Sequence, residues 1–173
     1  MTNKLSVREI CIFAMLGTLM FSSKMLTESL PNIHLLGVLT ISYTVAFRYK
    51  ALIPIYVFVF LTGIYAGFSV WWWPYLYLWA VLWGMTMLIP KRMPTKVAAP
   101  VYMAVCGLHG LIYGTLYSPY QALMFGLNFK QTLAWIMAGL PYDAIHAVSN
   151  TIAGVLVVPI STLLIKLNKN VIT

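Results

Sequence analysis

Apolar residues run along almost the whole chain, in stretches interrupted by short charged or Pro/Gly-containing segments. Each stretch is close to the ~20 residues that an α-helix needs to cross a ~30 Å hydrocarbon core. The pattern therefore predicts an all-α polytopic membrane protein, a single integral membrane domain over residues 1–173 with six transmembrane helices. The predicted spans cover residues 10–29, 32–47, 51–68, 75–90, 97–117 and 141–165.

The composition supports this class. Hydrophobic residues make up 61% of the chain and charged residues 8%, whereas a soluble domain of this size needs a far more polar surface. No small-residue cleavage site follows the first apolar stretch, so we expect that stretch to remain as a transmembrane helix. Cys11 and Cys106 lie in different predicted spans without CxxC or Cys/His spacing, and we interpret them as packing residues.

The net charge of +8 follows a topology pattern. If the N-terminus is cytoplasmic, only Lys24 and Lys130 among the basic residues fall on the outer side. Because lysine and arginine are enriched in cytoplasmic loops, both termini are predicted to be cytoplasmic, and the charge requires no nucleic-acid partner. The basic residues on the predicted inner side are Lys4, Arg8, Arg48, Lys50, Lys91, Arg92, Lys96, Lys166 and Lys169.

Residues 118–140, between the last two predicted spans, are too many for a tight turn and too apolar for a free loop. We interpret them as an interfacial or re-entrant helix on the outer face. The aromatic run VWWWPYLYLW, residues 70–79, fits the belt of Trp and Tyr that forms at a membrane interface. The sequence contains no Walker A motif, so any ATP-driven step must occur on another chain.

The segment GLPYDAIHAVSN, residues 139–150, places polar side chains in the last predicted span. Asp143, His146 and Asn150 are separated by three and four residues and therefore share one helix face. Because polar residues in a membrane helix face protein or a cavity, we interpret this stripe as a binding site. Pro141 also fits the start of a helix, where the Asp143 carboxylate would complement exposed N–H groups.

Other polar and aromatic residues are predicted at the same depth, in the outer half of the bundle. Trp and Tyr rings suit a flat ring, while His, Asn and Asp can fix its donors and acceptors, which favours binding over catalysis. Glu28 equally fits an i, i+4 ion pair with Lys24, and His109 an interhelical hydrogen bond. The additional candidate binding residues are Tyr113, Tyr117, His109, Trp79, Tyr75, His34 and Glu28.

Other interpretations stay open. Asp143 and His146 could act as an acid/base pair in a small intramembrane enzyme, or couple protons in a self-sufficient secondary transporter. The stripe could also be purely structural, as hydrogen bonding between helices. The sequence lacks GxSxG and HExxH motifs and a second close carboxylate. His34, Asp143 and His146 could bind a metal but have no recognised spacing, and we expect neither a metal nor a cofactor.

Four segments in combination resemble a known family over nearly the whole chain. They are REICIFAMLGTLMF, LPNIHLLGVLTISYTVAFRYKAL, WWWPYLYLW and AGLPYDAIHAVSNTIAGVLVVP. With six short predicted spans, the chain resembles the substrate-binding S component of an energy-coupling factor (ECF) transporter. The resemblance implies capture of a vitamin-like small molecule from outside the plasma membrane of a prokaryote. A transmembrane coupling protein and two ATPase subunits would then drive its release inside.

The resemblance also implies a docking face for the coupling protein. In the family an Ala-xxx-Ala pattern on the first helix serves this contact, and here the match is AMLGT, from Ala14 to Thr18 with Gly17 between them. Threonine replaces the second alanine. Nickel and cobalt members begin with Met-His, which MTNK lacks, so the implied substrate is an organic ring compound. Vitamin B6-like compounds, queuosine precursors, flavin- or thiamine-like compounds and corrinoids stay open.

Overall fold

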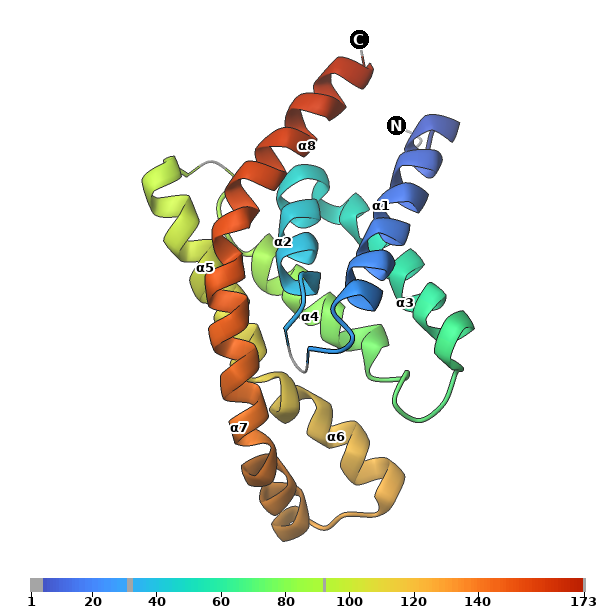
Figure 1. Ribbon diagram of the computed structural model, residues 1–173, viewed down its shortest axis with the longest axis vertical. Coiled ribbons are helices and arrows are strands. Elements are labelled where there is room, and N and C mark those ends of the chain that lie inside the picture. The colour runs from blue at the N-terminus through green and yellow to red at the C-terminus, as the bar shows by residue number, and fades with distance from the viewer. Residues whose placement is uncertain (1–4, 31–32, 92, 173) are drawn as a thin grey trace.

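Every regular element that the computed structural model describes is a helix (Figure 1). The structure describes residues 5–30, 33–91 and 93–172, with side chains up to Asn168. Two 3-10 turns, η1 (Arg48–Ala51) and η2 (Gly154–Leu156), join α2 to α3 and α7 to α8. The all-α prediction is confirmed for this part of the chain. The α-helices are α1 (Val7–Leu26), α2 (Leu36–Phe47), α3 (Leu52–Ala66), α4 (Tyr75–Met87), α5 (Thr95–Leu111), α6 (Tyr113–Phe125), α7 (Phe129–Ala153) and α8 (Val157–Ile172).

Four helical stretches of the described chain are long and apolar enough to cross a membrane. The helix Tyr75–Met87 is apolar but shorter. One long stretch, Leu36–Ala66, contains both α2 and α3, and Figure 1 shows the chain turning back between them. At this turn Arg48 has a φ of 55°, which breaks the helical path. The four stretches are Val7–Leu26, Leu36–Ala66, Thr95–Phe125 and Phe129–Asn168.

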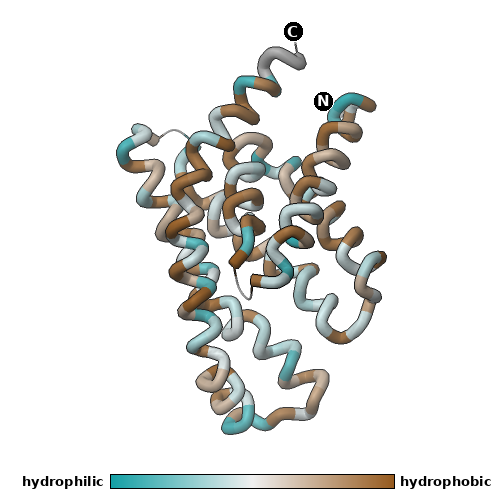
Figure 2. The backbone as a smooth tube through the Cα atoms, in the orientation of Figure 1, coloured by the Kyte–Doolittle hydropathy of each residue, from teal (hydrophilic) through white to brown (hydrophobic). Residues whose placement is uncertain are grey.

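The outer surface of the bundle is apolar. Large hydrophobic side chains such as Ile64 and Leu123 are more than two-thirds exposed, at 71% and 79%. Figure 2 shows hydrophobic positions along most of the length of the helices. Helices satisfy their own backbone groups, so a helical bundle with such a surface is suited to lipid. The fold is therefore consistent with a membrane location.

Both termini lie at one end of the bundle, and the hairpin of α6 and α7 lies at the opposite end (Figure 1). At the first end, Lys50 in η1 forms an ion pair with Glu9 in the first turn of α1. Arg48 donates a hydrogen bond to the carbonyl oxygen of Met87, at the end of α4, over 2.9 Å. Lys4 and Arg92, which the charge pattern assigns to the same side, lie outside the described residues.

The start of α7 differs from the prediction. This helix begins at Phe129, where Asn128 and Gln131 form a capping box, so a helix start at Pro141 is wrong. Pro141 lies inside the helix, which membrane helices tolerate because neighbouring groups satisfy the freed carbonyl. Residues 118–140 therefore form the end of α6 and the first turns of α7, and not a single interfacial or re-entrant helix. Their connection contains Gly126, at a φ of 63°.

The end of α5 also differs. The predicted span over residues 97–117 ends at Leu111, and the chain begins the separate helix α6 at Tyr113. Glycines in this region let α7 pack closely: a Cβ on Gly110 would lie 2.9 Å from the carbonyl carbon and oxygen of His146. A Cβ on Gly107 would overlap the Thr151 hydroxyl. The α5–α7 contact thus depends on residues without side chains.

The prediction that Cys11 is a packing residue is wrong, and the predicted docking residues lie on different sides of α1. Gly17 is buried, and a Cβ there would lie 2.8 Å from the carbonyl oxygen of Pro54 in α3. It therefore belongs to the α1–α3 contact, whereas Ala14 and Thr18 are exposed. Cys106 is buried, as expected of a packing residue, but Cys11 is exposed on α1. Helical spacing alone could not distinguish the protein-facing side of α1 from its outer side, because both carry apolar and small residues.

Candidate functional site

The polar stripe of α7 faces the interior of the bundle. Asp143, His146 and Asn150 are its buried residues, with exposures of 6%, 2% and 0%. Their neighbours Ile145 and Val148 are exposed. In an ordinary membrane helix the buried face is apolar or small, whereas here three polar groups occupy it. This inversion marks the stripe as the candidate site.

Aromatic rings surround His146. Its ring centroid lies 4.8 Å from that of His34, in the α1–α2 loop, and 5.0 Å from that of Tyr113, at the start of α6. Trp79 of α4 lies within 6.2 Å of both His34 and Tyr113. His109 of α5 lies 5.9 Å from Trp79. Segments far apart in the sequence therefore bring these rings into one cluster, which we call the aromatic–histidine cluster: His34, Trp79, His109, Tyr113 and His146.

Several polar atoms in and beside this cluster are buried with no hydrogen-bond partner among the described residues. Both atoms of the Asn150 side-chain amide belong to this set. An unpaired buried polar group costs roughly 1–3 kcal/mol, so several in one place call for an explanation. A bound molecule with matching donors and acceptors would supply one. The unpaired atoms here are Nδ1 of His34, Nε1 of Trp79, Nδ1 of His109, Nε2 of His146, and Oδ1 and Nδ2 of Asn150.

The tautomer of His109 follows from its contact. Nε2 lies 3.1 Å from the carbonyl oxygen of Leu78. A carbonyl oxygen only accepts, so Nε2 carries the proton and Nδ1 is left as an acceptor. The indole N–H of Trp79 can only donate. The cluster therefore presents at least one fixed acceptor and one fixed donor within a small volume.

His34 lies in the loop between α1 and α2, outside the four helical stretches that could span a membrane. Burial, and after it the nearby His146, lowers the pKa of His34 to about 3. Its ring is therefore neutral at physiological pH. A neutral imidazole offers one donor and one acceptor, which suits recognition of an uncharged polar ring.

Asp143 contacts the backbone of α6. Its carboxylate oxygens accept hydrogen bonds from the backbone N–H of Gly114, at 3.1 and 3.2 Å. Gly114 lies in the first turn of α6, where backbone N–H groups have no intrahelical partner. The carboxylate thus complements the N-terminus of α6, and not that of its own helix. Gly114 allows this close approach, because a Cβ there would lie 2.5 Å from Oδ2 of Asp143.

The other candidate residues divide between the cluster and its surroundings. Tyr75 contacts Trp79 edge-on, with centroids 5.8 Å apart. Tyr117 donates to the carbonyl of Trp71 at 3.2 Å and stacks on Trp135. Glu28 is exposed and lies 3.6 Å from Lys24, so it forms the i, i+4 pair weighed in the sequence.

Sequence reasoning missed some of the residues that build this site. Trp135 stacks on Tyr117 because the first turns of α7 fold back along α6. Gly107, Gly110 and Gly114 bring α5 and α6 against the polar face of α7. Their spacing in GLHGLIYG, three and four residues apart, was a readable sign of close helix packing.

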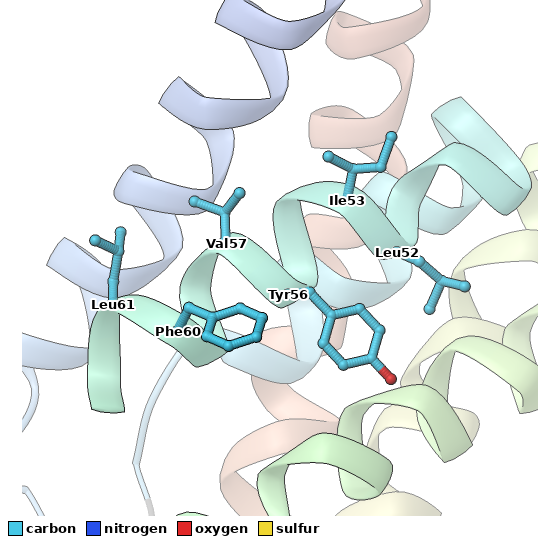
Figure 3. Close-up of a pocket in the computed structure, with 6 residues that line it drawn as sticks. All are labelled: Leu52, Ile53, Tyr56, Val57, Phe60 and Leu61. Carbon is cyan, nitrogen blue, oxygen red and sulfur yellow. The ribbon is translucent and has the colours of Figure 1, made fainter. Parts of the chain in front are cut away.

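The described residues contain no group of three or more His, Cys, Asp or Glu side chains that could hold a metal ion. In particular, Asp143 faces Gly114, whereas His146 faces His34 and Tyr113. A surface groove of about 500 Å³ lies along α3, apart from the cluster (Figure 3). Its lining is suited to acyl chains and consists of Leu52, Ile53, Tyr56, Val57, Phe60 and Leu61.

No protein-family model, curated protein or solved structure matches this chain. Functional reasoning therefore rests on the sequence and on the geometry of the aromatic–histidine cluster.

Proposed function

We propose that this protein is the substrate-capture subunit of an ECF-type importer for a ring-containing vitamin or micronutrient precursor. The observation that carries the proposal is the set of unpaired polar atoms on His146, Asn150, His109 and Trp79, buried among aromatic rings. Pockets for small molecules combine apolar and aromatic walls with a few convergent polar groups. The resemblance of the sequence to S components supports the same function.

In this proposal the chain crosses the membrane six times, with both termini in the cytoplasm of a prokaryote. The shared end of the two termini and the basic residues at that end support this orientation. The aromatic–histidine cluster then belongs to the outer half of the bundle, from which a ligand is captured. A transmembrane coupling protein and two ATPase subunits supply the energy, since this sequence has no Walker A motif.

The ligand is proposed to be a flat, uncharged heterocycle. Trp79 and Tyr113 would stack on it, while Asn150 and His146 would bind its edge. Among the described residues, Lys24 and Glu28 pair with each other over 3.6 Å, and the Asp143 carboxylate accepts from the Gly114 N–H. None of these charges is therefore free to neutralise a charged ligand. His34 packs on His146, so its ring must move aside as a ligand enters.

An Ala14→Leu variant should retain ligand binding but lose transport activity. Ala14 and Thr18 are exposed on α1, and a leucine there would keep another helix from approaching closely. We expect unchanged ligand affinity in the purified subunit, and uptake that falls about tenfold or more, since ~1.4 kcal/mol of lost docking energy is tenfold. The measurement is uptake of radiolabelled ligand in cells that express the coupling protein and ATPases.

The matched control is Ala104→Leu, at an exposed position of α5. It adds the same side chain to a different outer face and should leave uptake intact. Equal uptake by Ala14→Leu and wild type would contradict docking through this face of α1. Uptake that persists without any ATPase subunit would favour a secondary transporter.

An Asp143→Asn variant tests the alternatives in which Asp143 moves protons. Asparagine retains an oxygen that can accept from the Gly114 N–H, so α6 keeps its partner. We expect ligand affinity within about twofold of wild type, because the amide replaces a contact that the ligand does not make. Calorimetry on purified protein measures this affinity. Loss of proton-dependent uptake or of a catalysed reaction, with binding retained, would support a secondary transporter or an intramembrane enzyme.

A further inference from the structure

A second cavity, of about 350 Å³, lies at the end of the bundle that holds both termini. Its walls come from the start of α1, the end of α2 with η1, the end of α4, the loop after it, and α8. This cavity is separate from the aromatic–histidine cluster, because none of the cluster residues lines it. It therefore needs an explanation of its own.

The cavity is rich in positive charge. Arg48, Lys50 and Lys91 line it, and Glu9 is the only acidic residue in its lining. Glu9 already pairs with Lys50. Arg48 uses one guanidinium nitrogen to bind the Met87 carbonyl, while its Nε is buried without a partner among the described residues. Arg48 and Lys91 thus give the cavity a net positive character that no described carboxylate in its lining offsets.

The backbone holds Arg48 in an unusual conformation. Its φ of 55° is the one positive value among the described residues that are not glycine. Such a conformation costs of order 1–3 kcal/mol, and it persists only where the surroundings enforce it. Here Trp83 donates from its indole nitrogen to the Arg48 carbonyl at 3.1 Å, and the Met87 carbonyl holds the guanidinium. The turn thereby directs an arginine into the cavity wall.

An apolar groove of about 270 Å³ lies beside the cavity, between α1 and α8. Phe47 and Asn168 line both hollows, so the two are neighbours. The groove is otherwise lined by aliphatic and Met side chains, including Met15, Leu164 and Leu167. A basic hollow beside an apolar groove on a lipid-facing surface matches a molecule with a negative head and an acyl chain.

We propose that the two hollows together bind an anionic phospholipid, with its phosphate at Arg48 and Lys91 and an acyl chain along the groove between α1 and α8. Basic pockets between helices on the cytoplasmic side suit lipid phosphates. The bound lipid would brace α1 against α8. The assignment to the cytoplasmic leaflet rests on the orientation proposed above, but the site itself does not depend on substrate capture.

Native mass spectrometry of the detergent-purified protein tests the proposal, with dioleoyl phosphatidylglycerol, dioleoyl phosphatidylcholine and glycerol 3-phosphate as probes. We expect selective retention of phosphatidylglycerol. Lys91→Gln should weaken it about fivefold, the effect of roughly 1 kcal/mol per basic residue near an anionic lipid. Leu167→Trp, which fills the groove from a half-exposed position, should also weaken it. Both positions are exposed, so the variants should fold.

Lys96→Gln is the matched control, because Lys96 is exposed at the start of α5 and does not line the cavity. Its phosphatidylglycerol binding should equal that of wild type. Equal losses in Lys91→Gln and Lys96→Gln would overturn the proposal in favour of diffuse surface charge. Binding of phosphatidylcholine as tight as that of phosphatidylglycerol would show that the site does not distinguish an anionic headgroup from a zwitterionic one. Binding of glycerol 3-phosphate as tight as that of phosphatidylglycerol would assign the site to a soluble phosphate.

Discussion

Replacing Asn150 with leucine is expected to weaken ligand binding about a hundredfold without lowering the stability of the ligand-free protein. The Asn150 side chain is fully buried, and both of its polar atoms lack a partner among the described residues. Removing an unpaired buried amide relieves a desolvation penalty of roughly 1–3 kcal/mol, and leucine has a similar shape. The ligand in turn loses two hydrogen bonds, which at ~1.4 kcal/mol each is about a hundredfold in affinity.

This variant distinguishes a binding residue from a structural one. If Asn150 held helices together, leucine would lower the melting temperature of the ligand-free protein. If Asn150 instead binds a ligand, the leucine variant should melt at the same temperature as wild type or higher, while its ligand binding is weakened. Stability–function trade-offs predict this outcome. The measurements are thermal melting and calorimetry in the same detergent. Ser149→Ala is the control, because Ser149 lies on α7 beside Asn150 and donates to its own helix at the His146 carbonyl.

The largest loss of stability is expected from Trp79→Ala. Trp79 is 1% exposed and contacts the rings of Tyr75, Phe58, His109, Tyr113 and His34. Truncating a buried tryptophan costs about 3–5 kcal/mol, because the lost contacts leave a cavity. We therefore expect a strongly lowered melting temperature for the ligand-free protein, together with loss of binding.

Two further variants make this result interpretable. Trp73 is half-exposed in the same aromatic run, so Trp73→Ala should change stability little. Trp79→Phe retains a ring but not the indole N–H, and we expect it to fold and bind more weakly than wild type. A Trp79→Ala protein as stable as Trp73→Ala would contradict the packing described for the cluster.

The helical class and the polar stripe were accessible from the sequence because both depend on local periodicity. Asp143, His146 and Asn150 share a face wherever their helix begins, so the error at Pro141 did not disturb the stripe. The start of α7 was misjudged because a proline in the first turn is a common signal, and the capping box at Asn128 and Gln131 was overlooked.

Contacts between distant segments were not accessible in the same way. The partner of the Asp143 carboxylate is a backbone N–H of α6. Residue 114 is a glycine, so no side chain in the sequence indicates this contact. Gly17 faces α3 while Ala14 faces outward, although both fit one small-residue pattern. The basic cavity was equally hidden, because Arg48, Lys91 and Asn168 meet only when η1, the α4–α5 loop and α8 are placed together.

A thermal-shift screen of the purified, folded protein addresses substrate capture most directly. The panel contains B vitamins, purine and deazapurine precursors, corrinoids and divalent metal ions. We expect one organic ring compound to stabilise the protein, by ~4 kcal/mol at a free concentration 1,000 times its Kd, and the metal ions to have no effect. A folded protein that no compound in the panel stabilises would contradict the proposed capture of a ring compound.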